Sequence, residues 1–357
     1  MEEKALKFAA CVIGALTLVM GAALPFFPKF RTRLVDAKEE RQAQAEYERQ
    51  QQGKMQELEI LDELPQGQED ARQLKLRLPE DVDGGRITVV NDYVTQCVRI
   101  EVPGADNAYF DSYPIVGSSN HIDRLSYTMG NGGVSGSAGA GVIEIVLDRV
   151  YELDMDYDDE FYYFDFLTPK EVYDKVVVID AGHGGRAPGA TKQGVMEKEI
   201  DLAITLELRE IFQERGDNIG VYYTRTDDSN PTFDQRVQLA NLSGADLFVS
   251  IHNNSLGNGR MSDTNGTQVM YDESLEQSLK FARICLEEVT ASTGSKNRGL
   301  IEGDSIYILR NSDVPAALIE VGFMTNQREL ELLQTKEYQR KTAEGIYRAI
   351  RRALKEI

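Results

Sequence analysis

Two histidines and two glutamates are the residues of this chain whose types and positions best suit catalysis. His183 and His252 each come at the end of an apolar run typical of a buried strand, and the whole chain has only three histidines. Glu197 opens an amphipathic stretch typical of a helix, and Glu320 interrupts an apolar run. Open α/β sheets bind their ligands at the carboxyl ends of strands. We therefore expect these four side chains to meet at one edge of a sheet.

The types of these side chains suit a catalytic zinc site. Such a site takes three protein ligands and leaves a fourth position for water, whose pKa falls to about 7. His183, Glu197 and His252 would supply the ligands, because the few cysteines form no CxxC pair. Glu320 would take a proton from the water and pass it to the leaving group. Burial in an apolar run would raise its pKa toward a useful value.

Each candidate also has an ordinary structural explanation. A histidine can stand by chance in a turn between a strand and a helix, as His183 does in the glycine-rich stretch AGHGG. An acidic residue such as Glu197 is favoured in the first turn of a helix by the helix dipole. Glu320 is harder to explain in this way, because buried glutamates are rare without a partner. The combination favours a metal site over four unrelated residues.

Composition bounds the class of protein. With 357 residues, of which 41% are hydrophobic and 27% charged, the chain predicts two or three folded units with substantial cores. Its formal net charge is −20. Proteins that bind a nucleic-acid backbone need a basic patch. The acidic balance therefore argues against a nucleic-acid partner.

The N-terminal part of the chain, residues 1–33, is expected to be a cytoplasmic tail and a transmembrane anchor. Residues 8–28 carry no charge, and about 20 apolar residues span a bilayer as a helix. The alternative is a signal peptide, whose cleavage would leave a secreted protein. More basic residues follow the segment than precede it, which favours a cytoplasmic C-terminus. We nevertheless expect a single-pass cell-membrane protein with an extracytoplasmic catalytic domain, because of the function argued below.

Two regions separate the anchor from the C-terminal half. Residues 34–73 begin with many Ala, Glu, Gln, Lys and Arg residues, which favour a helical stalk, although a disordered linker explains them equally well. Residues 74–168 contain short β-branched and aromatic runs separated by turn signals. This pattern predicts an all-β, sandwich-like domain.

Strands and helices alternate from residue 172 to residue 357, which predicts an α/β domain with a mostly parallel sheet flanked by helices. The expected strands lie near 175–180, 220–224, 246–251, 266–271, 305–310 and 316–321. The expected helices lie near 198–214, 232–242, 274–291 and 336–355.

Six stretches between residues 172 and 357 follow one another in the order and spacing of a known family. They are VVVIDAGHGG with PGA at 188–190, GVMEKEIDL, YYTRTDD, ADLFVSIHNNS, NRG at 297–299, and YILRNSDVPAALIEVGFMTNQRE. On these stretches, residues 172–357 resemble the zinc-dependent N-acetylmuramoyl-L-alanine amidases, a family of cell-wall hydrolases. The resemblance implies that His183, Glu197 and His252 bind Zn²⁺ and that Glu320 is the catalytic acid and base. It also implies hydrolysis of the amide bond between N-acetylmuramic acid and L-alanine in peptidoglycan, for wall turnover or cell separation.

The sequence departs from the family pattern at some positions near these motifs. Asp201 stands where asparagine is usual, and Ala181 and Ala187 stand where proline and aspartate are frequent. None of the three matches a metal ligand, so the departures bear on the shape of loops more than on activity. Further polar matches are interpreted as structural links: Arg225, Asp228, Arg236 and Asn241.

The expected partners are peptidoglycan, the membrane through the N-terminal helix, and an activator protein that the sequence does not identify. Residues 74–168 resemble wall-targeting modules of the family only in their placement. Two rival functions remain. One is a wall-binding or scaffold protein without catalytic activity, and the other is a zinc peptidase that cuts within the stem peptide.

Overall fold

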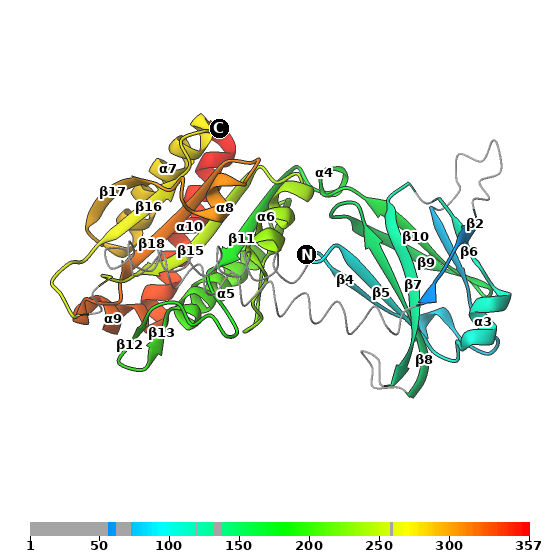
Figure 1. Cartoon of the computed structure of the whole chain (residues 1–357). Coiled ribbons are helices and arrows are strands. Elements are labelled where there is room, and N and C mark those ends of the chain that lie inside the picture. Colours follow the sequence, from blue (N-terminus) through cyan, green and yellow to red (C-terminus); the bar gives the residue numbers. More distant parts are fainter. Residues whose placement is uncertain (1–55, 62–72, 119, 132–137, 258–259) are drawn as a thin grey trace, which may run out of the picture.

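The computed structural model describes residues 56–61, 73–118, 120–131, 138–257 and 260–357. A β-sandwich and an α/β domain lie side by side, joined through the short helix α4 (Pro169–Val172) (Figure 1). The expected anchor at 8–28 and most of the expected stalk fall outside the described residues. Among the residues that are described, no helix combines the length and the apolar character needed to cross a membrane.

The sandwich consists of two sheets that have five strands each within the described residues, in the orders β1-β7-β8-β5-β4 and β2-β6-β3-β10-β9. The strands of the first sheet are β1 (Gln56–Glu57), β7 (Ile122–Asn131), β8 (Ala138–Leu147), β5 (Cys97–Val102) and β4 (Thr88–Asp92). Those of the second are β2 (Ile60–Leu61), β6 (Ile115–Gly117), β3 (Leu74–Arg77), β10 (Phe161–Leu167) and β9 (Glu152–Tyr157).

Alternating side chains build the core of the sandwich. In β10, Tyr162, Phe164 and Phe166 are buried, while the residues between them are only partly covered. This is the two-residue period of a strand that has one face on the core. The aromatic stretch therefore serves mainly as a core strand of the predicted sandwich.

The structure differs from the sequence-based prediction at two places in this domain. A helix, α3 (Asn107–Ser112), interrupts the strands, and it begins where the Asp106 side chain accepts a hydrogen bond from the Tyr109 backbone. The strands β1 and β2 lie in the range predicted as a helical or disordered stalk, so that prediction is wrong for them. Leu58 and Ile60 pack against the core of the sandwich, which explains why this segment pairs with the sheets.

The α/β domain has a central sheet in the order β14-β11-β15-β18-β16-β17, counted over the described residues. Neighbouring strands run parallel except β16 and β18, which are antiparallel. The sheet is therefore mostly parallel, as predicted. Its strands are β14 (Ile219–Tyr223), β11 (Lys175–Ala181), β15 (Leu247–Asn254), β18 (Ala316–Phe323), β16 (Thr267–Tyr271) and β17 (Asn297–Glu302).

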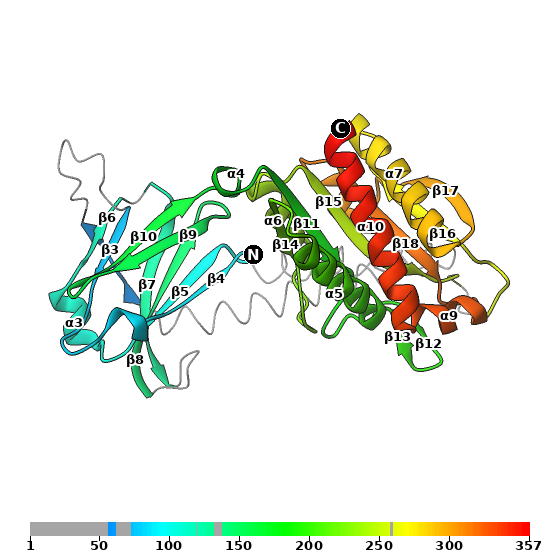
Figure 2. The ribbon, with the colours of Figure 1, turned by 180° about the vertical axis from the view of Figure 1, so that it is seen from behind.

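Helices cover both faces of this sheet. One face carries α5, α7 and α10, and the other carries α6 and α8 (Figure 2). The helices are α5 (Glu197–Arg215), α6 (Phe233–Leu242), α7 (Glu276–Thr293), α8 (Tyr307–Arg310), α9 (Gln327–Leu333) and α10 (Lys336–Glu356). A small hairpin, β12 (Thr191–Lys192) and β13 (Val195–Met196), leads into α5.

The strand predicted near 305–310 is wrong, because residues 307–310 form α8. Ile306, Ile308 and Leu309 are buried in this single turn, so their apolar run imitates a strand. The edge position of the sheet is taken instead by β17, whose glycine Gly299 and polar ends hide the strand pattern. The short helix α9 was also not predicted.

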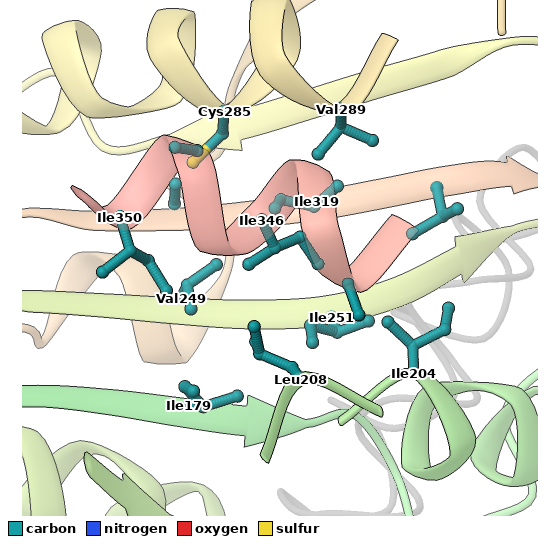
Figure 3. Packing of buried hydrophobic residues seen from close by; sticks show 14 of the residues in the cluster. Ile179, Ile204, Leu208, Val249, Ile251, Cys285, Val289, Ile319, Ile346 and Ile350 are labelled. Atoms are coloured by element: carbon teal, nitrogen blue, oxygen red, sulfur yellow. The ribbon is translucent and has the colours of Figure 1, made fainter. Parts of the chain in front are cut away.

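The larger core of the α/β domain lies between the sheet and α5, α7 and α10. Figure 3 shows Leu208 and Ile204 of α5 packed toward Val249 and Ile251 of β15, with Ile346 of α10 close by. All five of these side chains are fully buried. Since α5 begins at Glu197, this packing also fixes the end of the helix that carries a candidate ligand.

We predict that Leu208→Ala lowers the free energy of unfolding by about 2–5 kcal/mol, because it removes buried methyl groups and leaves a cavity. Leu332→Ala on α9 is the matched control, since Leu332 is 36% exposed, and its effect should stay within about 0.5 kcal/mol. Urea unfolding of both variants measures the difference. Equal effects of the two substitutions would contradict this placement of the core.

Candidate metal centre

His183 lies in the loop that follows β11. Its backbone has φ 58°, a left-handed conformation that residues other than glycine rarely adopt. The Arg236 guanidinium donates a hydrogen bond to the His183 carbonyl oxygen at 2.7 Å, which helps to hold this conformation. The side chain of His183 is 18% exposed. Among the candidate ligands it therefore faces the solvent most.

Glu197 is the first residue of α5. Its Oε2 accepts a hydrogen bond from the Ala190 backbone N–H at 2.7 Å, and its Oε1 accepts one from the Asn253 N–H at 3.1 Å. The start of a helix also favours a negative charge. A Cβ atom at Gly189 would lie only 2.6 Å from Glu197 Oε2. The loop can therefore approach this carboxylate only with glycine at that position.

His252 and Glu320 lie on neighbouring strands at the same edge of the sheet. They are direct partners in the parallel register of β15 and β18. Both are largely buried, at 9% and 4% exposure. A Cβ atom at Gly182 would stand 2.4 Å from the His252 ring, so that glycine makes room for the imidazole.

Three of the four side chains converge on one point. Glu197 Oε1 lies 3.2 Å from His183 Nε2 and 3.1 Å from His252 Nδ1. The two imidazole rings stand edge to face, with centroids 4.8 Å apart. Glu320 lies beside this point through its register with His252. The structure thus brings together the residues that the sequence analysis selected from distant parts of the chain.

Asp201 is a member of this cluster that the sequence analysis had set aside. One potential ligand atom each from His183, Glu197, Asp201 and His252 lies within 4.8 Å of all the others. Asp201 Oδ1 accepts a hydrogen bond from the Asn253 side chain at 2.8 Å, whereas Oδ2 is buried without a hydrogen-bond partner among the described residues. The signal was present in the sequence, because residues four apart on a helix share a face.

The surroundings shift the pKa values of the two cluster carboxylates of α5, Glu197 and Asp201, in opposite directions. Burial by itself would raise the pKa of Glu197, but His183 and His252 outweigh it and hold the pKa well below its usual value. Burial, followed by the charge of Glu197, raises the pKa of Asp201 well above its usual value. Glu197 is therefore the carboxylate that stays ionised between the two imidazoles.

A second layer of buried polar groups holds the loop that carries His183. Asp180 at the end of β11 accepts hydrogen bonds from Arg236 at 2.6 Å, Ser250 at 2.5 Å and Thr224 at 2.7 Å. Burial would raise the pKa of Asp180, but Arg236 and the two hydroxyl groups lower it to about 2. Asp180 is thus a charged anchor inside the sheet.

Arg225 forms the second brace of this layer. Its guanidinium donates to the carbonyl oxygens of Ala181 at 3.0 Å, Gly182 at 2.6 Å and Lys198 at 2.9 Å. These carbonyls adjoin His183 and Glu197 in the sequence. The structure therefore agrees with the interpretation of Arg225 and Arg236 as structural links.

The donor set fits a divalent transition metal. Two imidazole nitrogens and a carboxylate oxygen are ligands that zinc accepts in catalytic sites. Here Glu197 and His252 are buried, and the His183 side chain is 18% exposed. The unpartnered oxygen of Asp201 is one more potential oxygen ligand next to the same point. Glu320 is not a member of this cluster, and it is the register partner of His252 on the neighbouring strand.

Comparison with known proteins identifies the family to which the α/β domain is similar. A family model described as N-acetylmuramoyl-L-alanine amidase matches residues 177–352. The germination-specific N-acetylmuramoyl-L-alanine amidase of Bacillus subtilis (strain 168) is 32% identical over 192 residues, which are 50% of this chain and 79% of that protein. An uncharacterized protein of the same strain, YqiI, is 36% identical over 178 residues, or 49% of this chain and 83% of that protein.

A solved structure shows the same likeness. The N-acetylmuramoyl-L-alanine amidase of Clostridium difficile 630 has 32% sequence identity to this chain and a TM-score of 0.48. The match covers 51% of this chain and 97% of that structure.

We predict that Asp180→Asn lowers the free energy of unfolding by about 3 kcal/mol at pH 7, because it leaves Arg236 buried without its counter-charge. The folded pKa of Asp180 is about 2 and the ordinary value is 3.8. A carboxyl group whose pKa is lower in the folded state stabilises the fold at pH values above its pKa in the unfolded state. This stabilisation is lost as the pH falls toward the pKa of the folded state. The difference between wild type and variant should therefore shrink between pH 4 and pH 2.

Urea unfolding at several pH values measures this difference. Asp263→Asn removes an exposed carboxylate and serves as the control, with the same stability as the wild type at each pH. A difference between Asp180→Asn and wild type that does not change with pH would contradict the assignment of the charge to Asp180.

Proposed function

The chain belongs to the N-acetylmuramoyl-L-alanine amidase family, and from this premise we propose that it hydrolyses the muramoyl–alanine amide with a zinc ion held by His183, Glu197 and His252. One observation carries the proposal. The imidazole nitrogens of His183 and His252 lie 3.2 Å and 3.1 Å from the same oxygen of Glu197. Such convergence of two imidazole nitrogens on one carboxylate oxygen suits a bound cation.

The residues of the site can divide the reaction between them. Zinc, when bound, supplies Lewis acidity, which polarises the scissile carbonyl and makes water a better nucleophile at neutral pH. Glu320 takes a proton from the attacking water as the new C–O bond forms. It then gives a proton to the alanine nitrogen as the C–N bond breaks. The products are the free lactyl carboxylate of the muramic acid and a stem peptide with a free amino end.

The burial of Glu320 supports this role. At 4% exposure, in the middle of an apolar strand, the carboxyl group is held away from bulk water and in one place. Its neighbour across the sheet is the candidate ligand His252. A group that must exchange a proton with water beside the metal would need such a position.

The rival functions predict different products. A peptidase that cuts within the stem peptide would leave peptide fragments attached to muramic acid. Mass spectrometry of digested peptidoglycan distinguishes them, because the amidase releases stem peptides that begin with alanine. A protein that only binds the wall would release neither.

We also propose that the protein acts outside the cytoplasm, because its substrate lies there, with residues 8–28 as a membrane anchor. Protease treatment of intact protoplasts tests this, and full protection of the catalytic domain would contradict it.

The β-sandwich is proposed as a wall-targeting module from its placement alone. Sedimentation of the Glu320→Gln protein with purified cell walls tests that role, and failure to sediment would rule it out.

Glu320→Gln should lower kcat by at least about a hundredfold, since the amide cannot exchange the proton. Zinc content should remain at the wild-type level, because Glu320 is not among the proposed ligands. Turnover of a soluble muramyl peptide and metal analysis of the same sample measure both effects. Glu273→Gln, at an exposed position on the same domain, is the control. Wild-type turnover in Glu320→Gln would eliminate the proposed proton transfer.

His252→Ala should lose both zinc and activity, because it removes a ligand that the protein buries beside Glu197. In the wild type, a chelator should abolish activity and added zinc should restore it. Metal analysis after dialysis is the measurement, and His121→Ala is the control, since His121 lies in the sandwich. Retention of zinc by His252→Ala would show that the metal site has been misplaced.

A further inference from the structure

The β-sandwich meets the α/β domain through a contact between Glu152, Tyr93 and Tyr222. Glu152 of β9 accepts hydrogen bonds from Tyr93 of its own domain at 2.8 Å and from Tyr222 of β14 at 2.5 Å. The two phenol rings meet edge to face, with centroids 4.9 Å apart. Burial and then Glu152 raise the pKa of both tyrosines, so both hydroxyl groups keep their protons and donate.

Apolar and backbone contacts accompany these hydrogen bonds. The backbone N–H of Val150 donates to the carbonyl oxygen of Leu242, at the end of α6, over 3.3 Å. The side chain of Val150 is 1% exposed and belongs to the same apolar cluster as Val237 and Leu239 of α6. Residues of the sandwich thus complete a core of the α/β domain.

The two domains also enclose a cleft of about 430 Å³. Residues 91–94 and Glu152 of the sandwich line one side of it, and residues 221–227 and Ser229 of the α/β domain line the other. The segment that follows β14 therefore faces the sandwich across this cleft.

The same segment braces both loops that carry metal ligands. Thr224 donates to Asp180 at 2.7 Å, and Arg225 donates to the carbonyls of Gly182 and Lys198. Asp228 accepts from the Gly185 N–H at 3.0 Å and from the Lys198 ammonium at 2.7 Å. This bracing segment, residues 224–228, begins two positions after Tyr222. His183 lies between the braced glycines, and Glu197 adjoins Lys198.

The conformation of His183 makes this bracing important. A non-glycine residue with φ 58° keeps that backbone only where its surroundings enforce it. Small displacements of metal ligands strongly affect a reaction that depends on their geometry. A shift of the bracing segment would therefore reach the ligands directly.

We propose that Glu152 of the β-sandwich is a positioning residue for the amidase reaction. By holding Tyr222 against the sandwich, it fixes the bracing segment and so the geometry of His183 and Glu197. The proposal rests on the proposed metal site, because the placement of the ligands is what Glu152 controls. The side chain of Glu152 accepts hydrogen bonds from the two tyrosines, so it would act on the metal ligands only through other residues.

The test compares Glu152→Ala, Tyr222→Phe and the double variant in the full chain. Substitutions in a network that links two sites typically change the coupling between the sites by about 0.5–2 kcal/mol. We therefore expect each variant to lose roughly three- to thirtyfold in kcat, with KM altered less than about twofold. The absorption spectrum of the cobalt-substituted enzyme should change as well, because it reports ligand geometry independently of turnover. The double variant should be no worse than Glu152→Ala, since that substitution already removes the contact with Tyr222.

Two controls accompany these variants. Glu152→Gln keeps one acceptor and gains an amide that can donate to the second tyrosine, so it should recover most of the wild-type kcat. Glu80→Ala, at an exposed position of the sandwich, should match the wild type in every measurement. Unfolding midpoints identify any variant that does not fold. If Glu152→Ala does not fold, Tyr222→Phe, which removes a single oxygen atom, tests the proposal in its place.

Unchanged kcat and an unchanged cobalt spectrum in folded Glu152→Ala or Tyr222→Phe would overturn the proposal. A lowered unfolding midpoint with wild-type kcat would also overturn it, because the contact would then serve stability alone. A wild-type enzyme that binds neither zinc nor cobalt would contradict the proposed function, whatever the variants show. The two failures are therefore distinguishable.

Discussion

The buried ion pair of Asp180 and Arg236 is the constraint on which the catalytic edge of the sheet depends. Removing both charges from water is costly, and their attraction compensates only when the remaining hydrogen-bonding groups are satisfied. Here Arg236 also donates to the carbonyls of Ala181 at 2.7 Å and His183 at 2.7 Å. The pair thus links the end of β11 to α6 and keeps an unfavourable backbone conformation in place at the first candidate ligand.

Much of the α/β domain could be predicted because its elements follow simple periods. Buried parallel strands such as β11 and β15 appear as continuous apolar runs, and their polar end residues mark the site. The predicted strand near 305–310 was wrong because the buried residues of the single turn α8 form an apolar run like that of a strand. The strand β17 was not predicted because Gly299 interrupts its apolar run. Asp201 was set aside as a departure from the family pattern, although its spacing of four residues from Glu197 on a helix places both on one face.

Contacts between domains are the part of the molecule that periodicity cannot indicate. Tyr93, Glu152 and Tyr222 come from separate parts of the chain, and only Tyr222 belongs to a matched stretch, YYTRTDD. Their association depends on the packing of one sheet edge against a hairpin turn. The sandwich therefore contributes to the environment of the catalytic domain as well as to its own fold.

The position of β18 in the sheet has a consequence for biosynthesis. This strand carries Glu320 and lies between β15 and β16, although β16 and β17 precede it in the chain. During synthesis, β15 and β16 therefore cannot be joined in one sheet until β18, the last strand in the chain, has left the ribosome. The proposed proton carrier therefore belongs to the strand that completes the sheet, and that strand is the last one in the chain.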